Sequence, residues 1–207
     1  MAREVTLKDK DGILYPQIGP EQIKADNIDF DESFIPGQLL VATRNYTTLA
    51  ASNWSNYTVW SAGDWEQYGP MAESTYPHVL RVKNTTGKTM VVELLLVCSS
   101  VNVPNSRVHC TGIVDLTNAS DSGSTWINLL GQTILSSNGG QTNIWAPAVV
   151  RKLEKIPPNS TRLFCPVVQC NGTGGYWLGG DWSHPSGLTT SFGGDACHFS
   201  AKLIDMV

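Results

Sequence analysis

Two aromatic-rich segments hold the residues best suited to bind a ligand. Each contains the tripeptide Gly-Asp-Trp, at residues 63–65 and at residues 180–182. An indole ring can stack on the apolar C–H face of a sugar, and a carboxylate accepts hydrogen bonds from the sugar hydroxyl groups. These segments are therefore a candidate glycan-binding site, formed by Trp60, Asp64, Trp65, Tyr176, Trp177, Asp181 and Trp182.

The same residues also suit a purely structural role. A Gly-Asp pair favours a tight turn, and a tryptophan that follows the turn can close one end of a β-sandwich. The chain contains seven tryptophans, so most of them must pack in a core or an interface.

Residues that could carry out catalysis do not form a recognisable motif. The sequence has no nucleophile elbow, no zinc-binding His-Glu helix and no phosphate-binding glycine loop. Glycan cleavage requires two carboxylates on either side of a sugar, and Asp64, Glu66, Asp181 and Asp195 are the candidates. Since nothing in their spacing pairs them, we expect a protein that is not an enzyme.

The five cysteines are an odd number with irregular spacing, which does not indicate a disulfide framework. We expect most of them to be buried, reduced thiols that pack as small hydrophobic groups. The neighbouring pairs His109-Cys110 and Cys197-His198 could supply metal ligands. Adjacent residues of a strand point to opposite faces, however, so the sequence predicts no metal site and no cofactor.

The charge pattern excludes several classes of partner. Only 15% of the 207 residues are charged, the net charge is −4 and the pI is about 5.5, so a basic surface for nucleic acid is not expected. The longest apolar stretch, residues 90–98, is too short to span a bilayer. The charged opening residues do not resemble a signal peptide. We expect synthesis in a cytoplasm and no membrane insertion.

Residues 37–207 are expected to form an antiparallel β-sandwich or jelly roll, because short apolar runs alternate there with segments rich in Gly, Ser, Asn and Pro. The runs at 79–83 and 90–98 are predicted to pair as a hairpin whose five-residue loop is residues 84–88. The expected strands are residues 39–43, 79–83, 90–98, 107–115, 148–153, 162–169 and 197–203.

Three of these strands have informative patterns. Residues 107–115 alternate between an apolar face and a polar face that contains His109 and Thr111. In residues 197–203 the odd positions are expected to face the core and the even positions to face outward. Residues 91–97 are apolar at nearly every position, so this strand is either central and covered on both sides or buried against another subunit.

Residues 1–36 form a separate segment that alternates short apolar stretches with charges and turn-forming residues. A segment of this length cannot bury a core by itself, so it is expected to be extended and either disordered or folded on a partner. The expected organisation is therefore a short N-terminal segment, 1–36, followed by a β-sandwich head domain, 37–207.

The N-terminal segment resembles the leader of phage fibre and spike subunits. The resemblance rests on residues 5–12, on Tyr15-Pro16 and on residues 23–30, and beyond them it extends only to the general layout of a leader followed by a β domain. It implies a homotrimeric virion appendage in which residues 1–36 attach to other virion proteins. Tail fibre, baseplate component and head fibre all remain open.

Together these features lead us to expect a structural virion protein made in the host bacterial cytoplasm. Its β-sandwich would bind a host-surface or environmental glycan such as a surface polysaccharide. Two alternatives remain: a depolymerase-type spike that cleaves glycans, and a capsid decoration protein that binds no ligand.

A variant that lacks residues 1–36 tests this organisation. Because that segment cannot bury a core, the variant should fold, as measured by circular dichroism, but should not be incorporated into particles. An unfolded variant would mean that residues 1–36 are part of the β domain and not an attachment segment.

Overall fold

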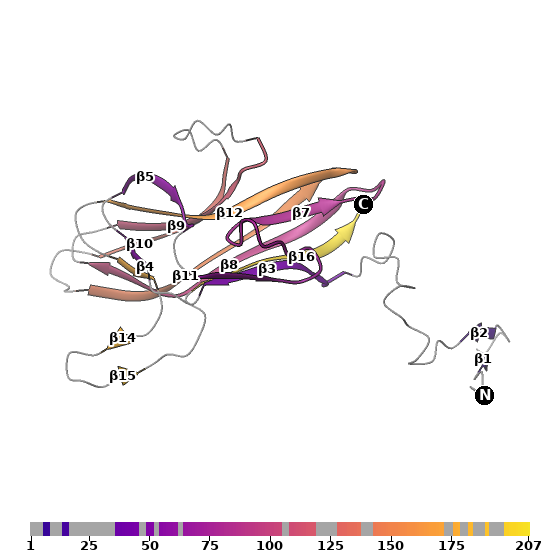
Figure 1. Ribbon diagram of the computed structural model, residues 1–207, viewed down its shortest axis with the longest axis horizontal. Helices are drawn as coiled ribbons and strands as arrows, with labels where there is room; N and C mark the ends of the chain where they lie inside the picture. The colour runs from indigo at the N-terminus through magenta and orange to yellow at the C-terminus, as the bar shows by residue number, and fades with distance from the viewer. Residues whose placement is uncertain are drawn as a thin grey trace. The chain divides into compact units, whose positions relative to one another are not determined.

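Every regular element in the described part of the chain is a β-strand, which confirms the all-β prediction (Figure 1). The chain divides into two units, Met1–Phe34 and Ile35–Val207. In the first unit, β1 (Thr6–Lys8) pairs antiparallel with β2 (Leu14–Pro16). The computed structural model describes residues 6–8, 14–16, 36–45, 49–51, 54–61, 64–104, 108–118, 128–137, 143–171, 176–178, 182–183, 189–190 and 197–207.

The second unit contains two antiparallel sheets that face each other as a sandwich (Figure 1). The first, here called the β12 sheet, has the strand order β10-β9-β12-β5, and β7 pairs with the same edge of β12 as β5. Its strands are β5 (Trp54–Val59), β7 (Leu80–Asn84), β9 (Val108–Asp115), β10 (Leu129–Ser136) and β12 (Ser160–Asn171).

The second sheet, here called the β8 sheet, has the order β4-β13-β8-β16-β3-β6. Strands β16 and β13 pair with successive parts of one edge of β8, and β11 pairs with its other edge. Two further short strands, β14 (Trp182–Ser183) and β15 (Thr189–Thr190), pair with each other. The strands of the β8 sheet are β3 (Leu39–Asn45), β4 (Leu49–Ala51), β6 (Trp65–Tyr68), β8 (Met90–Pro104), β11 (Asn143–Ile156), β13 (Tyr176–Leu178) and β16 (Cys197–Met206).

The core lies between the sheets and follows the alternation of side chains along each strand. The even positions of β8 from residue 90 to residue 98, such as Leu94 and Leu96, are fully buried. Opposite Leu96 on β16 is Phe199, also fully buried, and the β12 sheet contributes Phe164 and Leu80. The prediction that the odd positions of residues 197–203 face the core is therefore confirmed, whereas Ser200, at an even position expected to face outward, is also buried.

Strand β8 is central, with β16 on one edge and β11 on the other. Its place in the sheet explains why the residues on its inner face are apolar. The even side chains fill the core, whereas Val91, Leu95 and Val97 on the outer face are only half-buried.

The predicted hairpin between residues 79–83 and 90–98 is wrong. Strand β7 pairs with β12, while β8 belongs to the other sheet, so the intervening loop crosses from one sheet to the other. Asn84 supports this crossing, because its buried side-chain amide donates to the carbonyl oxygens of Lys88 at 2.8 Å and Ile156 at 3.0 Å. Both edges of β8 are already occupied, so β7 has no edge of that strand to join.

An ion triad joins the strands of both sheets. The Arg162 guanidinium on β12 bonds to the carboxylate of Asp115 on β9 at 2.5 Å and to that of Glu154 on β11 at 2.7 Å. Burial alone would raise the pKa of Asp115, but hydrogen bonds from Thr117 and Arg162 outweigh it and lower the pKa. Asp115 and Arg162 therefore stay ionised at neutral pH, and the Arg162 guanidinium contacts both carboxylates within a largely buried site.

Both faces of β9 are buried, including the one that the sequence marks as polar. His109 and Thr111 are fully buried, and His109 Nε2 lies 2.8 Å from Thr111 Oγ1. Burial disfavours the imidazolium form and lowers the pKa of His109 to about 4.

The buried His109 predicts a specific pH dependence of stability. Between pH 6.5 and 4 the unfolded chain binds a proton at this histidine and the folded chain does not. The free energy of unfolding should therefore fall by about 3 kcal/mol as the pH drops through this window, and the full stability should be present above pH 6.5. Urea unfolding at a series of pH values measures it.

The variant His109→Gln should lose most of this dependence. The comparison is His78→Gln, because burial also lowers the pKa of the half-buried His78. This variant should retain the larger part of the pH dependence of the free energy of unfolding. Equal pH profiles for His109→Gln and the unchanged protein would contradict the assignment.

Candidate functional site

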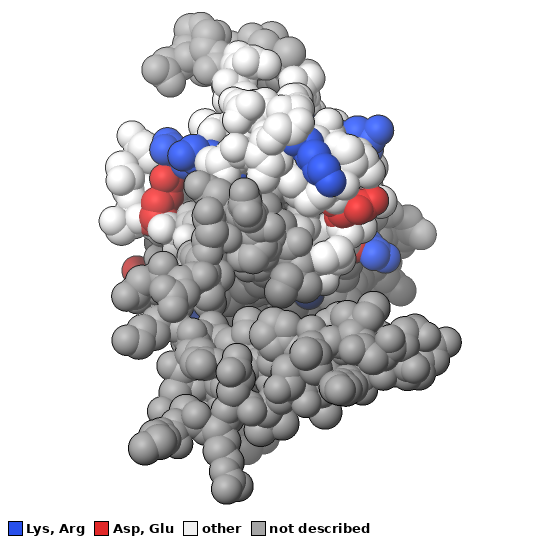
Figure 2. Space-filling view, turned by 90° about the vertical axis from the view of Figure 1, so that its right-hand side faces the viewer, with Lys and Arg blue, Asp and Glu red and all other residues white. Residues whose placement is uncertain are grey.

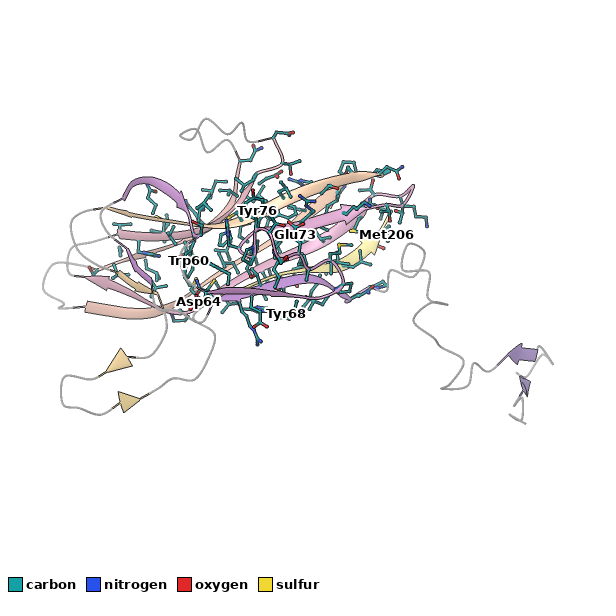
Figure 3. All side chains as sticks on the ribbon, in the orientation of Figure 1. Trp60, Asp64, Tyr68, Glu73, Tyr76 and Met206 are labelled. Atoms are coloured by element: carbon teal, nitrogen blue, oxygen red, sulfur yellow. The ribbon has the colours of Figure 1, made fainter. Side chains whose placement is uncertain are left out.

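The first Gly-Asp-Trp segment lies at the start of an edge strand. Asp64 is exposed and immediately precedes β6, which begins at Trp65 and pairs only with β3 among the described strands. Trp65 lies opposite Asn45 in this register, on the face of the strand that also carries Gln67. Figure 3 labels Asp64 and Trp60 from this region.

Trp60 is part of the core and not of a binding surface. Its side chain is only 1% exposed, and its backbone N–H donates to the carbonyl of Pro166 at 2.9 Å. The indole Nε1 has no hydrogen-bond partner within the described part of the chain. Since a sugar cannot stack on a ring that solvent does not reach, the structure removes Trp60 from the candidate residues.

Trp65 links this core position to the surface. Its ring meets that of Trp60 edge-on, with centroids 5.4 Å apart and planes at 80°. Trp65 is half-buried, so part of its indole is accessible beside the exposed Asp64. These two residues can offer a sugar one apolar surface and one hydrogen-bond acceptor, which is a binding arrangement and not a catalytic pair.

Hydrogen bonds from Gln67 hold the segment that follows β6. Its amide nitrogen donates to the carbonyl of Val79 at 2.6 Å, and its amide oxygen accepts from the backbone N–H of Glu73 at 2.7 Å. Tyr76, at the tip of this segment, is 58% exposed (Figure 3). The edge strand and the segment after it are thus fixed to each other next to Asp64 and Trp65.

A second cluster lies on the outer face of the β8 sheet. Arg44 forms an ion pair with Glu66 at 3.0 Å and lies over the ring of Tyr68, 5.5 Å from its centroid. The hydroxyl of Tyr68 is 2.6 Å from Nε2 of His198. Sequence reasoning missed this cluster because its members come from β3, β6 and β16, and only the strand register brings them together.

The second Gly-Asp-Trp segment falls largely outside the described residues. Trp182 begins β14, while Tyr176 and Trp177 lie in β13, which pairs with β4 at one end of the β8 sheet. The side chains of these three residues, and all of Asp181, are outside the described part. Their proposed role in binding therefore stays a prediction.

The described ranges contain no cluster of three or more His, Cys, Asp or Glu side chains able to hold a metal ion. They also contain no helix long and apolar enough to cross a membrane. The four described cysteines are buried and reduced, as predicted, and burial raises the pKa of the Cys165 thiol. These thiols are Cys98, Cys110, Cys165 and Cys197.

The class of protein that the two sheets define is an all-β sandwich. No protein-family model matches the chain, and no curated protein matches it. Among solved structures, the chain is similar to that of Eiger TNF from S. frugiperda, with 14% sequence identity and a TM-score of 0.42. That match covers 81% of this chain and 94% of the other chain.

Proposed function

We propose that this chain is a non-enzymatic structural subunit of a phage fibre or spike, located in the virion. In this proposal, residues 1–36 attach it to other virion proteins, and three copies associate through the outer face of the β8 sheet. The end of the sandwich that carries Asp64 and Trp65 binds a glycan of the host surface. The resemblance of residues 5–30 to phage leaders supports the attachment role.

The observation that carries the association is the apolar outer face at the centre of the β8 sheet. Val149 and Leu153 of β11 are 49% and 55% exposed, although both are aliphatic residues in the middle of a strand. The register places Val149 beside Val97, and Leu95 is the next outward residue of β8. A contiguous group of this kind marks a contact surface more often than it marks free surface.

A second copy of this chain is the occupant that the surrounding charges favour. The ion pairs Arg151–Glu93 and Arg44–Glu66 both lie on this outer face, so each copy brings both signs of charge next to the apolar centre. In a closed ring of three copies, cations on one part of this surface can meet carboxylates on another part of the surface of the next copy.

The distribution of charge also supports a partner other than nucleic acid. Among the described residues that Figure 2 shows, the Lys and Arg side chains and the Asp and Glu side chains stand among uncharged ones and form no large patch of one sign. Nucleic-acid binding surfaces instead concentrate Lys and Arg on one face.

The variant Leu95→Lys tests the association. Light scattering should detect a mass of about three times 22.5 kDa for the unchanged protein. The variant should have a lower mass, because the lysine charge buried in the contact would have no partner. Ile134→Lys is the matched control, since Ile134 is 56% exposed on β10 of the other sheet and should keep the higher mass. Circular dichroism should show both variants folded.

A stable monomer for the unchanged protein would overturn the association. Loss of mass in both variants would mean that the contact is not on the β8 sheet.

Glycan binding is tested with Trp65→Ala and Trp182→Ala. Each should abolish adsorption to host cells or to a glycan array while lowering the free energy of unfolding by about 1 kcal/mol or less. Trp60→Ala is the contrasting variant, because truncating a fully buried tryptophan should cost about 3–5 kcal/mol. Adsorption and urea unfolding are measured on the same preparations.

Unchanged adsorption of Trp65→Ala and Trp182→Ala would refute the glycan site. Release of new reducing sugar ends by the unchanged protein would instead support the alternative of a glycan-cleaving spike.

A further inference from the structure

Two of the buried thiols face each other across neighbouring strands. Cys98 on β8 and Cys197 on β16 are directly opposite in the antiparallel register. Both side chains are fully buried, and their sulfur atoms lie 3.9 Å apart, with the thiol of Cys98 directed at the sulfur of Cys197. No other described element separates the two thiols.

This geometry is close to that of a disulfide. Side chains directly opposite in an antiparallel pair have Cβ atoms about 4.5–5.5 Å apart, and a disulfide requires about 3.5–4.5 Å. A small approach of the strands, together with rotation about the Cα–Cβ bonds, is enough to bring the sulfurs to bonding distance. We propose that Cys98 and Cys197 are a latent disulfide site that fastens the C-terminal strand to the centre of the β8 sheet.

The reaction with a low-molecular-weight disulfide proceeds in two exchange steps. One cysteine thiolate attacks a sulfur of the reagent, which breaks the reagent's S–S bond, forms a mixed disulfide and releases one reagent thiolate. The second cysteine thiolate then attacks the protein sulfur of the mixed disulfide and releases the other reagent thiolate. The protein loses two electrons and the reagent gains them, while the two protons of the cysteines end on the two reagent thiols.

Burial determines when this bond can form. A reducing cytoplasm keeps both thiols reduced while the chain folds, and an oxidising environment outside a cell favours the bond. In the folded protein the reagent reaches the sulfurs only when β16 separates locally from β8, so oxidation of the folded chain is slow. This site goes beyond the proposed function and does not depend on it.

The bond would stabilise the fold because it closes a long loop. The two cysteines are 99 positions apart, and a crosslink over such a separation removes much of the conformational entropy of the unfolded chain. It would also hold β16 between β8 and β3, its two neighbours in the sheet. The C-terminal strand would then be unable to leave the sheet without breaking a covalent bond.

Cys165 provides a matched control within the same chain. It is also fully buried, but it lies opposite Val114 in the β12 sheet, and its thiol donates to the carbonyl of Pro166 at 3.5 Å. Replacing it with alanine removes one buried thiol, as the variants Cys98→Ala and Cys197→Ala do, without touching the proposed pair.

The test refolds the full chain from denaturant in a buffer of oxidised and reduced glutathione at mildly alkaline pH. Refolding gives the reagent access to every thiol before burial. Titration under denaturing conditions should find two fewer free thiols than the five of the reduced chain, and mass spectrometry of a digest should find the peptides of Cys98 and Cys197 joined. The melting temperature should rise by about 10 °C, and dithiothreitol should reverse the rise.

The variants decide between this pair and any other. Cys165→Ala should still form the linked peptide and show the rise in melting temperature, whereas Cys98→Ala and Cys197→Ala should show neither. The proposal is overturned if the refolded chain retains five free thiols, if the digest joins a different pair, or if the crosslinks are between chains.

Discussion

Strand β8 hydrogen-bonds to β11 along one edge for nearly its full fifteen residues, and to β16 along the other edge over residues 90–98. Since a strand has only two edges, this pairing determines where several other elements can lie. Strand β7 pairs with β12 in the opposite sheet, so the loop between β7 and β8 crosses from one sheet to the other. The buried side-chain amide of Asn84 supports this loop. Over residues 90–98 the same pairing places the even residues of β8 in the core and leaves the odd residues 91–97 at the centre of an outer face. The proposed association and the proposed disulfide both depend on this strand.

The polar groups inside the sandwich are tolerated for two different physical reasons. Arg162 is ionised and has two carboxylate partners, so the favourable interactions of the charges offset the loss of water. The imidazole of His109 lies next to the hydroxyl of Thr111, two residues further along the same face of β9. It remains neutral at pH 7 because burial lowers its pKa. The first arrangement connects the two sheets, while the second makes the stability of β9 sensitive to acid.

The aromatic segment before and within β6 divides into a core part and a surface part. Trp60 is enclosed, Trp65 contacts it edge-on, and Asp64 between them in sequence is exposed. The core tryptophan thus supports a half-exposed one, which gives the surface residue a fixed orientation. An indole held in this way loses little conformational freedom when a ligand stacks on it, and this favours Trp65 over Trp60 as a ligand contact.

The sequence by itself determined the all-β class, the positions of seven of the sixteen described strands and the inward face of residues 197–203, because turn residues and side-chain alternation are local properties of the chain. It also determined that the cysteines would be buried thiols, as the four with described side chains are. Only the tertiary structure decided which strands are neighbours. The hairpin predicted for β7 and β8 failed for that reason, and the cluster of Arg44, Tyr68 and His198 was not foreseen. The placement of Cys98 directly opposite Cys197 likewise follows from the pairing of β8 with β16. Pairing between residues far apart in sequence depends on which strand edges remain free once the sheets form, and no local pattern encodes that competition.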